Sequence, residues 1–486
     1  MEAAMHDSTS ALQTLIDAEK LQYCYECGIC TATCPMVELL PEHYHPRTLL
    51  QRIFLDLDGV LKEEALWLCA WCYRCYRRCP QQLLLPEIFL RARKLAVKKG
   101  YLGGLEEAAE LIRKEIPLPR VCQQVCFHPE RADIDILQTI RTNYEFRKEM
   151  ETAPQRKNGD KIAIVGSGPA GLTAACELAM TGFQVTVFES SSELGGMLRE
   201  CMPTYRLPKK VLEADIEHVK KLGIEIRTSV TIGEELTLQD FSKEGYKAVF
   251  LATGAHKSRE LRIEGTELKG VIYALDLLRK TNLGKEIKLG ERVAVIGGGN
   301  VAMDAARTAL KLGAKDVSIL YRRSREEMPA NPWEVKEAEG EGVKISFLVS
   351  PTKILGEHGQ VTAVECVRME LGELDETGRK RPAPIEDSEF TTELETVILA
   401  IGESPDLSLL PEEIEVSEQN TILVDPVTME TNLPGVYAGG DVVSGPASVI
   451  EAIGAGKRAA LSIHRYLKGE DTKGGEIEVS VRHEGR

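Results

Sequence analysis

The sequence has no run of apolar residues that approaches the roughly 18 needed for a membrane-spanning helix. Its first ten residues, MEAAMHDSTS, have neither the positive charges nor the apolar core of a secretory signal. Repeats at the periods of solenoid proteins are absent as well. We therefore expect a cytoplasmic protein that does not span a membrane.

Positive charge is scarce relative to negative charge, with 60 Lys and Arg residues against 75 Asp and Glu residues. The formal net charge of −15 repels phosphate backbones and anionic lipid surfaces, so we expect no nucleic-acid partner. Hydrophobic residues at 43% and charged residues at 28% are close to the averages of folded globular proteins. The 486 residues are enough for about three domains.

Periodicity and turn residues divide the chain. Clustered cysteines come first and are followed by runs with apolar residues three and four apart, which predict an α-helical domain. After the polar stretch ETAPQRKNGD, strand-like runs alternate with helical segments, as in doubly wound α/β sheets. These runs are KIAIVG, QVTVFE, AVFLATG, RVAVIGGG, VSILYRR, TVILAIG and VYAGGD. The expected domains are 1–155, a discontinuous α/β domain of 156–290 and 400–486, and an α/β domain of 291–399.

The thirteen cysteines are odd in number, and eight of them form two tight groups, which favours metal-ligating thiolates over disulfides. Both groups spell CxxCxxCxxxCP, a spacing that wraps three thiolates around a [4Fe-4S] cluster while the fourth usually crosses to the other cluster. A zinc site is the alternative, but it usually uses two separated CxxC pairs. We expect one cluster on Cys24, Cys27, Cys30 and Cys79, and the other on Cys69, Cys72, Cys75 and Cys34.

The segment between the two groups looks helical and is long for a compact ferredoxin. The phrases CGICTATCP and CAWCYRCYRRCP resemble the dicluster ferredoxin subunit of heterodisulfide reductase and, more distantly, the iron-sulfur subunit of succinate dehydrogenase. The resemblance covers about the first 90 residues and implies an α-helical ferredoxin. Cys122 and Cys126, with His128 nearby, are better interpreted as structural or vestigial thiols than as a third metal site.

A first nucleotide-binding turn follows the strand KIAIV. Its glycines are Gly166, Gly168 and Gly171, and Glu189 ends the next strand. Glycines there let the backbone close on a pyrophosphate at a helix N-terminus, and the acidic residue can bind the adenosine ribose. Later strings, FLATGA and GVYAGGDVVSGPASVIEAIGAGK, are typical of a flavoprotein with two dinucleotides. Asp441 would contact the ribityl chain and the helix after Pro446 would point at the flavin ring, so the first cofactor is expected to be FAD.

A second turn lies at Gly297, Gly299 and Ala302, again between a strand and a helix. The next strand ends in Arg322 and Arg323, where an NAD site usually has an acid, and guanidinium groups suit a 2′-phosphate. This favours NADP(H), with NAD(H) as the second choice. The alternative role for the arginines is a surface pair neutralised by Glu326 and Glu327.

Residues 161 to about 468 resemble the small subunit of NADPH-dependent glutamate synthase. Similar modules occur in ferredoxin:NADP oxidoreductases of the bifurcating type and in dihydropyrimidine dehydrogenase. The strings that carry the resemblance are GSGPAG, MPTYRLPKKVLEADI, ATGAHKS, GVIYALDLLRK, GGGNVAMDAART, YRRSREEMPA and VYAGGDVVSGPASVIEAI. It implies FAD at Gly166, Ser167, Gly168, Pro169, Ala170, Gly171, Glu189, Gly196, Leu198, Thr253, Gly254, Gly440, Asp441, Ala447 and Ser448. It implies NAD(P)H at Gly297, Gly299, Asn300, Val301, Arg322 and Arg323.

One element departs from that family. The family carries its clusters on a different N-terminal module with a GRVCP...CE element, and PLPRVCQQVCFHPE resembles an eroded form of it. The dicluster motif is expected to have taken over its role.

The sequence therefore predicts an electron relay, an NAD(P)H-linked iron-sulfur flavoprotein that exchanges electrons with a partner carrying iron-sulfur or flavin centres. Such a partner implies a hetero-oligomeric complex. Cys176, Cys201 and Cys366 form neither CxxC nor CxxxxC, which argues against a disulfide substrate. The alternatives are a non-catalytic electron-transfer or assembly subunit, an NADH-specific or electron-bifurcating flavoprotein, and an iron-sulfur redox sensor.

Overall fold

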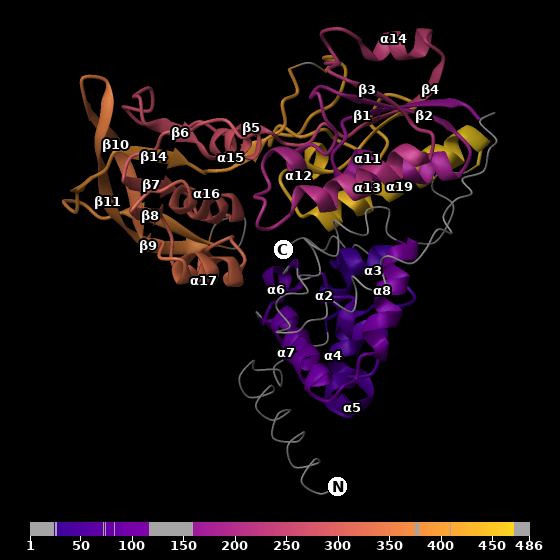
Figure 1. Cartoon of the computed structure of the whole chain (residues 1–486), viewed down its shortest axis with the longest axis horizontal. Helices are drawn as coiled ribbons and strands as arrows, with labels where there is room; N and C mark the ends of the chain where they lie inside the picture. Colours follow the sequence, from indigo (N-terminus) through magenta and orange to yellow (C-terminus); the bar gives the residue numbers. More distant parts are fainter. Residues whose placement is uncertain are drawn as a thin grey trace, which may run out of the picture.

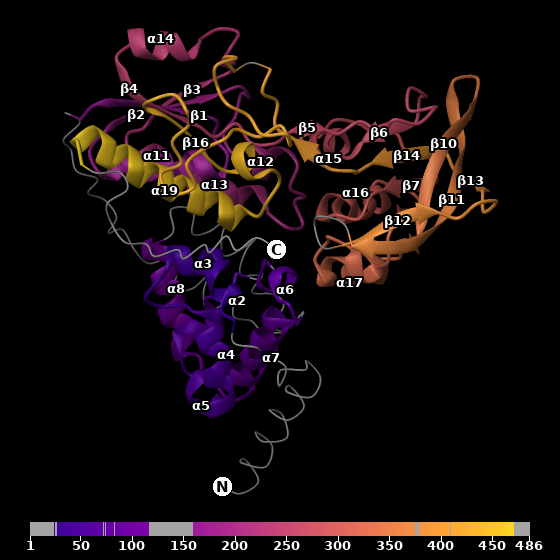
Figure 2. The same cartoon turned by 180° about the vertical axis from the view of Figure 1, so that it is seen from behind.

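The structure, a computed structural model, describes Cys24, 27–70, Cys72, 74–81, 83–115, 159–374, 379–408 and 410–470. Three bodies are visible in Figure 1: a helical body formed by the N-terminal residues, and two α/β bodies above it. The view from behind in Figure 2 shows the same separation. Within the described ranges, no helix is long and apolar enough to cross a membrane. Cys122, Cys126 and the polar tail beyond residue 470 lie outside these ranges.

The N-terminal body consists of short helices around a buried apolar core. Proline stands in the first turn of several of them, where its missing N–H costs no helical hydrogen bond. Leu50, Ile53, Leu66 and Phe89 are fully or almost fully buried and hold the helices together. The elements are α2 (Ile29–Ala32), α3 (Pro35–Leu39), α4 (Pro46–Leu55), α5 (Leu57–Val60), η2 (Glu64–Trp67), α6 (Arg74–Arg78), α7 (Leu85–Lys98) and α8 (Gly103–Glu115).

The first α/β body contains a parallel sheet in the order β16-β4-β1-β2-β3. Its strands are β1 (Lys161–Val165), β2 (Gln184–Glu189), β3 (Glu225–Thr228), β4 (Tyr246–Leu251) and β16 (Val436–Ala438). β16 pairs with β4, so residues near the end of the chain return to this body. Its helices are α11 (Pro169–Met180), α12 (Met197–Glu200), α13 (Lys209–Lys221), α14 (Leu238–Lys243), α18 (Asp441–Ser444) and α19 (Val449–Lys468). α11 and α19 lie against each other between this sheet and the N-terminal body (Figure 1).

The second α/β body has a parallel sheet in the order β6-β14-β7-β8-β9. Its strands are β6 (Val271–Tyr273), β7 (Arg292–Ile296), β8 (Asp316–Tyr321), β9 (Lys344–Phe347) and β14 (Thr396–Leu399), and its helices are α15 (Ala274–Asn282), α16 (Asn300–Lys311), η4 (Arg325–Glu327) and α17 (Pro332–Gly340). Because β6 pairs with β14, this sheet takes up residues that precede the expected boundary at residue 290.

Two features join or extend these bodies. An antiparallel sheet that the sequence pattern did not predict follows β9; it contains β10 (Val349–Glu357), β11 (Gln360–Leu374), β12 (Lys380–Pro384) and β13 (Phe390–Glu393). The chain passes between the two α/β bodies twice, and the two connecting segments pair as a short antiparallel ribbon of β5 (Lys257–Ser258) and β15 (Glu403–Ser404). The α/β fold with two nucleotide-binding turns is thus confirmed.

Candidate functional site

The first glycine turn lies between β1 and α11. Gly166 has φ +101°, and a Cβ there would lie 2.4 Å from the carbonyl oxygen of Ala252. A Cβ on Gly171 would lie 2.0 Å from the carbonyl oxygen of Gly166. Gly168 caps α11 without a side-chain hydrogen bond, so the first amides of the helix remain available to an anion. The turn therefore fits a dinucleotide pyrophosphate.

Glu189 ends β2 beside this turn, and it is buried. Its carboxylate accepts hydrogen bonds from the N–H of Ser167 at 3.0 Å, the hydroxyl of Ser167 at 2.5 Å and the N–H of Ser191 at 2.8 Å. These bonds fix the carboxylate in the wall of a cavity beside the turn, where it could accept hydrogen bonds from ribose hydroxyls.

Two further carboxyl groups line the same cavity. Desolvation raises the pKa of Asp441 to about 7, although the N–H of Ala447, 3.3 Å away, favours the charged form. Desolvation also raises the pKa of Glu403, against the opposing effect of Arg259, and Glu403 contributes to the shift at Asp441. Sequence reasoning predicted Asp441 but missed Glu403, which has no motif of its own.

The second glycine turn repeats the geometry of the first. Gly297 has φ +145°, and a Cβ there would lie 2.1 Å from the carbonyl oxygen of Ala400. Gly299 caps α16 without a side-chain hydrogen bond. Asn300, at the first position of α16, accepts the N–H of Asn331 at 2.9 Å and so fixes the loop before α17. This turn fits a second pyrophosphate.

The two arginines after β8 occupy different environments. Arg322 is exposed, whereas Arg323 is buried and donates its Nε–H to the carbonyl oxygen of Lys380 at 2.9 Å. The hydroxyl of Ser324 lies 2.6 Å from the carboxylate of Glu326 and 2.9 Å from that of Glu327, and it can donate to either. These contacts hold both carboxylates against the η4 turn. The predicted pair is therefore not symmetric.

A cavity of about 740 Å³ connects the parts of the site. It is lined by every predicted FAD residue except Gly171, which packs behind the turn. Of the predicted NAD(P)H residues, Asn300 and Val301 line it; the lining does not include Gly297, Gly299, Arg322 or Arg323. Two residues of the N-terminal body, Ala70 and Cys72, also line it. One cavity thus borders all three bodies.

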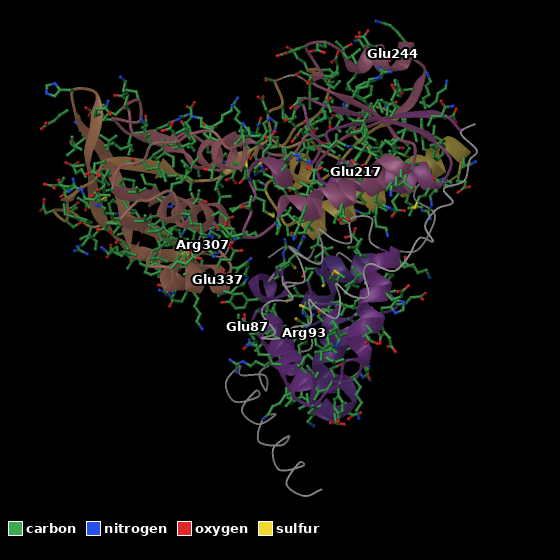
Figure 3. The ribbon with its side chains drawn as sticks, viewed as in Figure 1. Glu87, Arg93, Glu217, Glu244, Arg307 and Glu337 are labelled. Carbon is green, nitrogen blue, oxygen red and sulfur yellow. The ribbon has the colours of Figure 1, made fainter. Side chains whose placement is uncertain are left out.

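A buried polar network crosses this cavity between the two α/β bodies. Arg206, from the loop before α13, forms ion pairs with Asp304 of α16 at 2.8 Å and with Glu334 of α17. The hydroxyl of Tyr205 donates to Asp304 at 2.8 Å. Only the string MPTYRLPKK hinted at this loop, and its partners are too distant in sequence to predict. On the same helices, Arg307 donates to Glu337 at 2.9 Å (Figure 3).

The described cysteines of the N-terminal body fall into two sets. Cys34 is partly buried, and desolvation together with the neighbouring Cys72 and Cys69 raises its pKa. Burial raises the pKa of Cys30, and the neighbouring Cys24 and Cys27 add to this shift. Cys34 therefore lies beside Cys69 and Cys72 of the second motif.

Thiolates that are grouped in this way, with hydrogen-bond donors beside them, suit an iron-sulfur cluster. Among the described residues, no group of three or more His, Cys, Asp or Glu side chains is arranged to hold a metal ion. Tyr44 is buried and forms a side-chain hydrogen bond with Cys69. Arg93 is also buried and donates to the carbonyl oxygens of Leu66 at 2.8 Å and Cys69 at 3.1 Å. Neither residue was expected from the sequence.

The remaining described cysteines do not form a redox pair. Cys176, Cys201 and Cys366 are buried, free and not disulfide-bonded. Burial raises the pKa of each to about 12, which keeps them as unreactive thiols. Cys201 lines the cavity, but its thiol points to the carbonyl oxygen of Leu275 at 3.8 Å.

The fold and the two glycine turns define a flavoprotein-type oxidoreductase with two dinucleotide-binding bodies. Residues 160–456 match the pyridine nucleotide-disulphide oxidoreductase family, and residues 20–83 match the 4Fe-4S dicluster domain. The chain belongs to the pyridine nucleotide-disulphide oxidoreductase family and carries a 4Fe-4S dicluster domain in front of it. The resemblance to the glutamate synthase small subunit, the fold class and the oxidoreductase class are confirmed.

Curated relatives give the same result. The chain is 42% identical over 403 residues to the NADP(+)-dependent formate dehydrogenase subunit beta of Moorella thermoacetica, covering 75% of this chain and 57% of that protein. It is 34% identical over 399 residues to the glutamate synthase [NADPH] small chain of Azospirillum brasilense, covering 75% of this chain and 82% of that one. The chain thus spans less than two thirds of the length of the formate dehydrogenase subunit.

Among solved structures, FprA from Mycobacterium tuberculosis has the same fold in its α/β part. The TM-score is 0.57 at 22% identity, over 64% of this chain and 85% of that one. This likeness supports the two-sheet architecture alone.

Proposed function

We propose that the protein passes electrons between NADPH and a partner protein through FAD and two [4Fe-4S] clusters. The observation that carries this proposal is the single cavity, whose walls come from both nucleotide-binding bodies and from Ala70 and Cys72 of the cysteine-containing body. A hydride donor, a flavin and a cluster ligand can therefore lie close together in one cavity, so electrons need not cross bulk solvent between them.

In this proposal FAD lies along the first turn. Its pyrophosphate binds the amides at the start of α11, its ribose binds Glu189, and its ribityl chain lies by Asp441. NADPH binds at the second turn, with Asn300 and Val301 at the cavity and the exposed Arg322 available to the 2′-phosphate. Bound flavin would supply the change from two-electron hydride transfer to one-electron transfer.

The eight cysteines of the repeated motif are proposed as ligands of two clusters, with Cys34 and Cys79 exchanged between the motifs. The proximity of Cys34 to Cys69 and Cys72 supports this exchange. The proposed domains are 1–155 for the clusters, 156–290 with 400–486 for FAD, and 291–399 for NADPH, with β6 and α15 reassigned to the last.

The partner is proposed to be another subunit with iron-sulfur or flavin centres, in a cytoplasmic complex. The name of the Moorella thermoacetica relative, subunit beta of an NADP(+)-dependent formate dehydrogenase, supports a hetero-oligomeric arrangement. The substrate of that enzyme does not carry over to this chain, which spans only part of the relative's length.

The test is anaerobic reduction of the purified protein by NADPH. Bleaching of the flavin absorbance followed by an electron paramagnetic resonance (EPR) signal of reduced clusters is the expected result. A flavin that NADPH leaves oxidised, in protein that dithionite does reduce, contradicts the proposal. NADH, added at the same concentration, is the matched control and should reduce the flavin more slowly.

A further inference from the structure

Three contacts bring one of the two cysteine sets against the flavin side of the molecule. The first is made by the segment that carries Cys69 and Cys72, which we call the cysteine loop. Its residues Ala70 and Cys72 line the cavity together with Gly440, Ser448 and Ala452. Cys72 belongs to the set that contains Cys34, Cys69 and Cys75, and no described cysteine of the other set lines this cavity.

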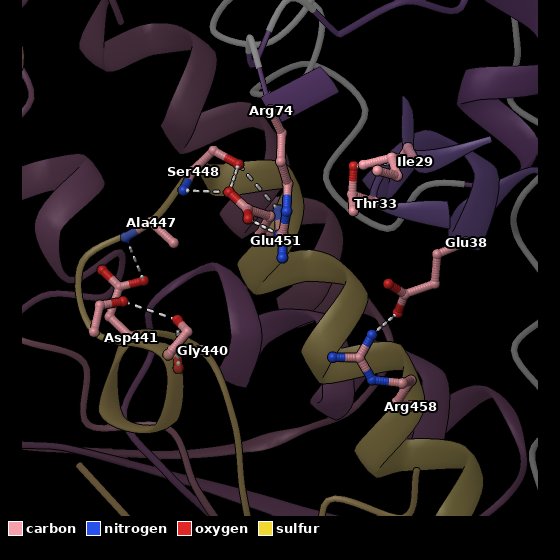
Figure 4. Close-up of polar contacts among 12 residues, drawn as sticks. Ile29, Thr33, Glu38, Arg74, Gly440, Asp441, Ala447, Ser448, Glu451 and Arg458 are labelled. Atoms are coloured by element: carbon pink, nitrogen blue, oxygen red, sulfur yellow. Dashed lines mark hydrogen bonds and ion pairs between the residues drawn. The ribbon is translucent and has the colours of Figure 1, made fainter. Parts of the chain in front are cut away.

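The second contact comes from α6, which begins two residues after Cys72. Arg74 forms an ion pair with Glu451 in the first turn of α19 (Figure 4). Glu451 also closes the capping box with Ser448, whose N–H lies 3.0 Å from the carboxylate. The same carboxylate thus joins the cysteine loop to the start of α19, where Ala447 and Ser448 border the cavity.

The third contact is made by α3, whose N-cap residue is Cys34. α3 packs on α19, where Glu38 forms an ion pair with Arg458 (Figure 4). Gly454 allows this close approach, because a Cβ there would lie 3.1 Å from the carboxylate of Glu38. Two helices that begin at or beside Cys34 and Cys72 are therefore both fixed to α19.

The other set lies elsewhere on the N-terminal body. Cys27 is exposed, and Ile29, at the start of α2, is also exposed. Cys30 lies on α2, which packs on α6 and α4 and takes no part in the ion pairs with α19 described above. Cys27 is thus the exposed cysteine of this set, whereas Cys69 and Cys75 of the first set are buried.

We propose that the cluster on Cys34, Cys69, Cys72 and Cys75 is the inner cluster, which exchanges electrons directly with the flavin. The cluster on Cys24, Cys27, Cys30 and Cys79 is the outer cluster, through which electrons reach the partner. This order rests on the proposed function. One hydride brings two electrons to the flavin; each passes singly through the inner to the outer cluster and on to the partner's oxidised centre, and one proton is released to water.

Arg74 acts in this arrangement as a positioning residue, since it contacts the helix that borders the flavin site and not the reacting atoms. The ion pair is partly buried, so it lies in a setting where charge pairs are screened less than at an open surface. Its loss would free the cysteine loop on the side that faces the cavity.

The order of the clusters is tested with two cysteine variants, Cys34→Ser and Cys30→Ser. EPR spectra after dithionite reduction first establish which cluster each variant retains, independently of turnover. In Cys30→Ser, NADPH should still reduce the inner cluster at the wild-type rate. In Cys34→Ser, the flavin should bleach normally while the outer cluster is reduced at least about tenfold more slowly, as expected for a misplaced or missing intermediate.

Rapid reduction of the outer cluster in Cys34→Ser would overturn the order. A wild-type flavin that NADPH does not bleach would instead contradict the proposed function, so the two failures can be told apart. If Cys34→Ser assembles neither cluster, the rate of cluster reduction in Arg74→Gln tests the proposal instead.

Arg74→Gln should leave flavin bleaching by NADPH unchanged and slow reduction of the inner cluster about tenfold, while Arg74→Lys restores it. Arg325→Gln is the matched control, because Arg325 pairs with Glu339 in the second α/β body. An unchanged rate of cluster reduction in Arg74→Gln would show that the ion pair does not position the inner cluster and would overturn the proposal.

Discussion

At the scale of single residues, the two arginines after β8 are chemically alike but differ in what their guanidinium groups can still bind. Arg322 is exposed, whereas the Nε–H of the buried Arg323 is already donated to Lys380. A 2′-phosphate needs charge-assisted hydrogen bonds, and a guanidinium at the surface offers its full set of donors. The structure therefore refines a prediction that treated the two residues as equivalent.

We expect Arg322→Ala to lower kcat/KM for NADPH by roughly 10- to 150-fold, the effect of losing about 1.5–3 kcal/mol of charge-assisted hydrogen bonding. The value for NADH should barely change. Steady-state kinetics with both cofactors at fixed ionic strength measure this. Arg325→Ala is the control, and equal losses for NADPH and NADH in Arg322→Ala would contradict a contact with the 2′-phosphate.

The carboxyl group of Asp441 gives a second prediction at this scale. Its pKa is about 7 in the folded protein, against an ordinary value of 3.8. Between these values the folded state binds more protons than the unfolded state, so the contribution of Asp441 to stability falls as pH rises from about 4 to about 7. Asp441→Asn should therefore gain stability, relative to wild type, as the pH is raised across this window.

Thermal unfolding of the flavin-free protein from pH 4 to pH 8 measures this difference. Asp406→Asn is the control, because the hydroxyl of Ser408 lowers the pKa of Asp406 and gives the opposite sign. Parallel pH profiles for wild type and Asp441→Asn would show that Asp441 is not desolvated in solution.

At the scale of elements, α19 packs against a different body with each of two faces. One face packs on α11, whose N-terminus forms the pyrophosphate site, and the other on α3 of the N-terminal body. Gly456 and Gly454 serve these two faces. A Cβ on Gly456 would lie 2.4 Å from the backbone carbonyl oxygen of Ala170, whereas one on Gly454 would meet only the end of the Glu38 side chain.

These contacts predict different outcomes for the same substitution. Gly456→Ala should destabilise the protein by about 1–3 kcal/mol through overpacking against α11, and it should also weaken retention of FAD. Gly454→Ala should be nearly neutral, because Glu38 can move and alanine gains roughly 0.5–1 kcal/mol of helix propensity. Unfolding midpoints and the flavin content of the purified variants measure both, and equal effects would contradict the proposed division of the two faces.

What the sequence could predict at this scale depends on how local each signal is. The turns at Gly166 and Gly297 follow directly from a strand, a glycine pattern and a helix, and both strands and helices are present. β6 was not predicted because its pairing with β14 depends on residues more than 100 positions away. The contacts of Arg206 with Asp304 and of Arg74 with Glu451 are equally non-local, and no motif marks either pair.

At the scale of the whole molecule, one cavity is bordered by all three bodies, so the contacts that join the bodies determine how the proposed cofactors lie relative to one another. The α/β bodies are joined by the β5–β15 ribbon and by the Arg206 network, and α19 joins the flavin side to the cysteine-containing body. The side chain of Lys457 adds to this last junction, with its Nζ donating to the carbonyl oxygen of Glu115 at 2.7 Å. The residues predicted for each cofactor nevertheless come from one body each, so loss of one cofactor should not remove the others.

This independence leads to the last prediction. Wild-type protein reconstituted under anaerobic conditions should hold about eight iron atoms per chain, from two [4Fe-4S] clusters, and should release FAD and not FMN on denaturation. Glu189→Ala removes the acceptor proposed for the ribose and also the hydrogen bonds that Ser167 of the turn donates to it. We expect FAD to bind roughly 10- to 150-fold more weakly, the consequence of losing about 1.5–3 kcal/mol of hydrogen bonding to a charged group.

The iron content of Glu189→Ala should stay at the wild-type value, because the cysteines and their buried neighbours Tyr44 and Arg93 lie in another body. Iron, acid-labile sulfide and flavin analysis of the same preparation measure all three quantities. Glu244→Ala, at the end of α14 (Figure 3), is the control for nonspecific effects of removing a carboxylate. Iron near four per chain in the wild type would contradict two clusters, and joint loss of flavin and iron in Glu189→Ala would show that the bodies do not assemble independently.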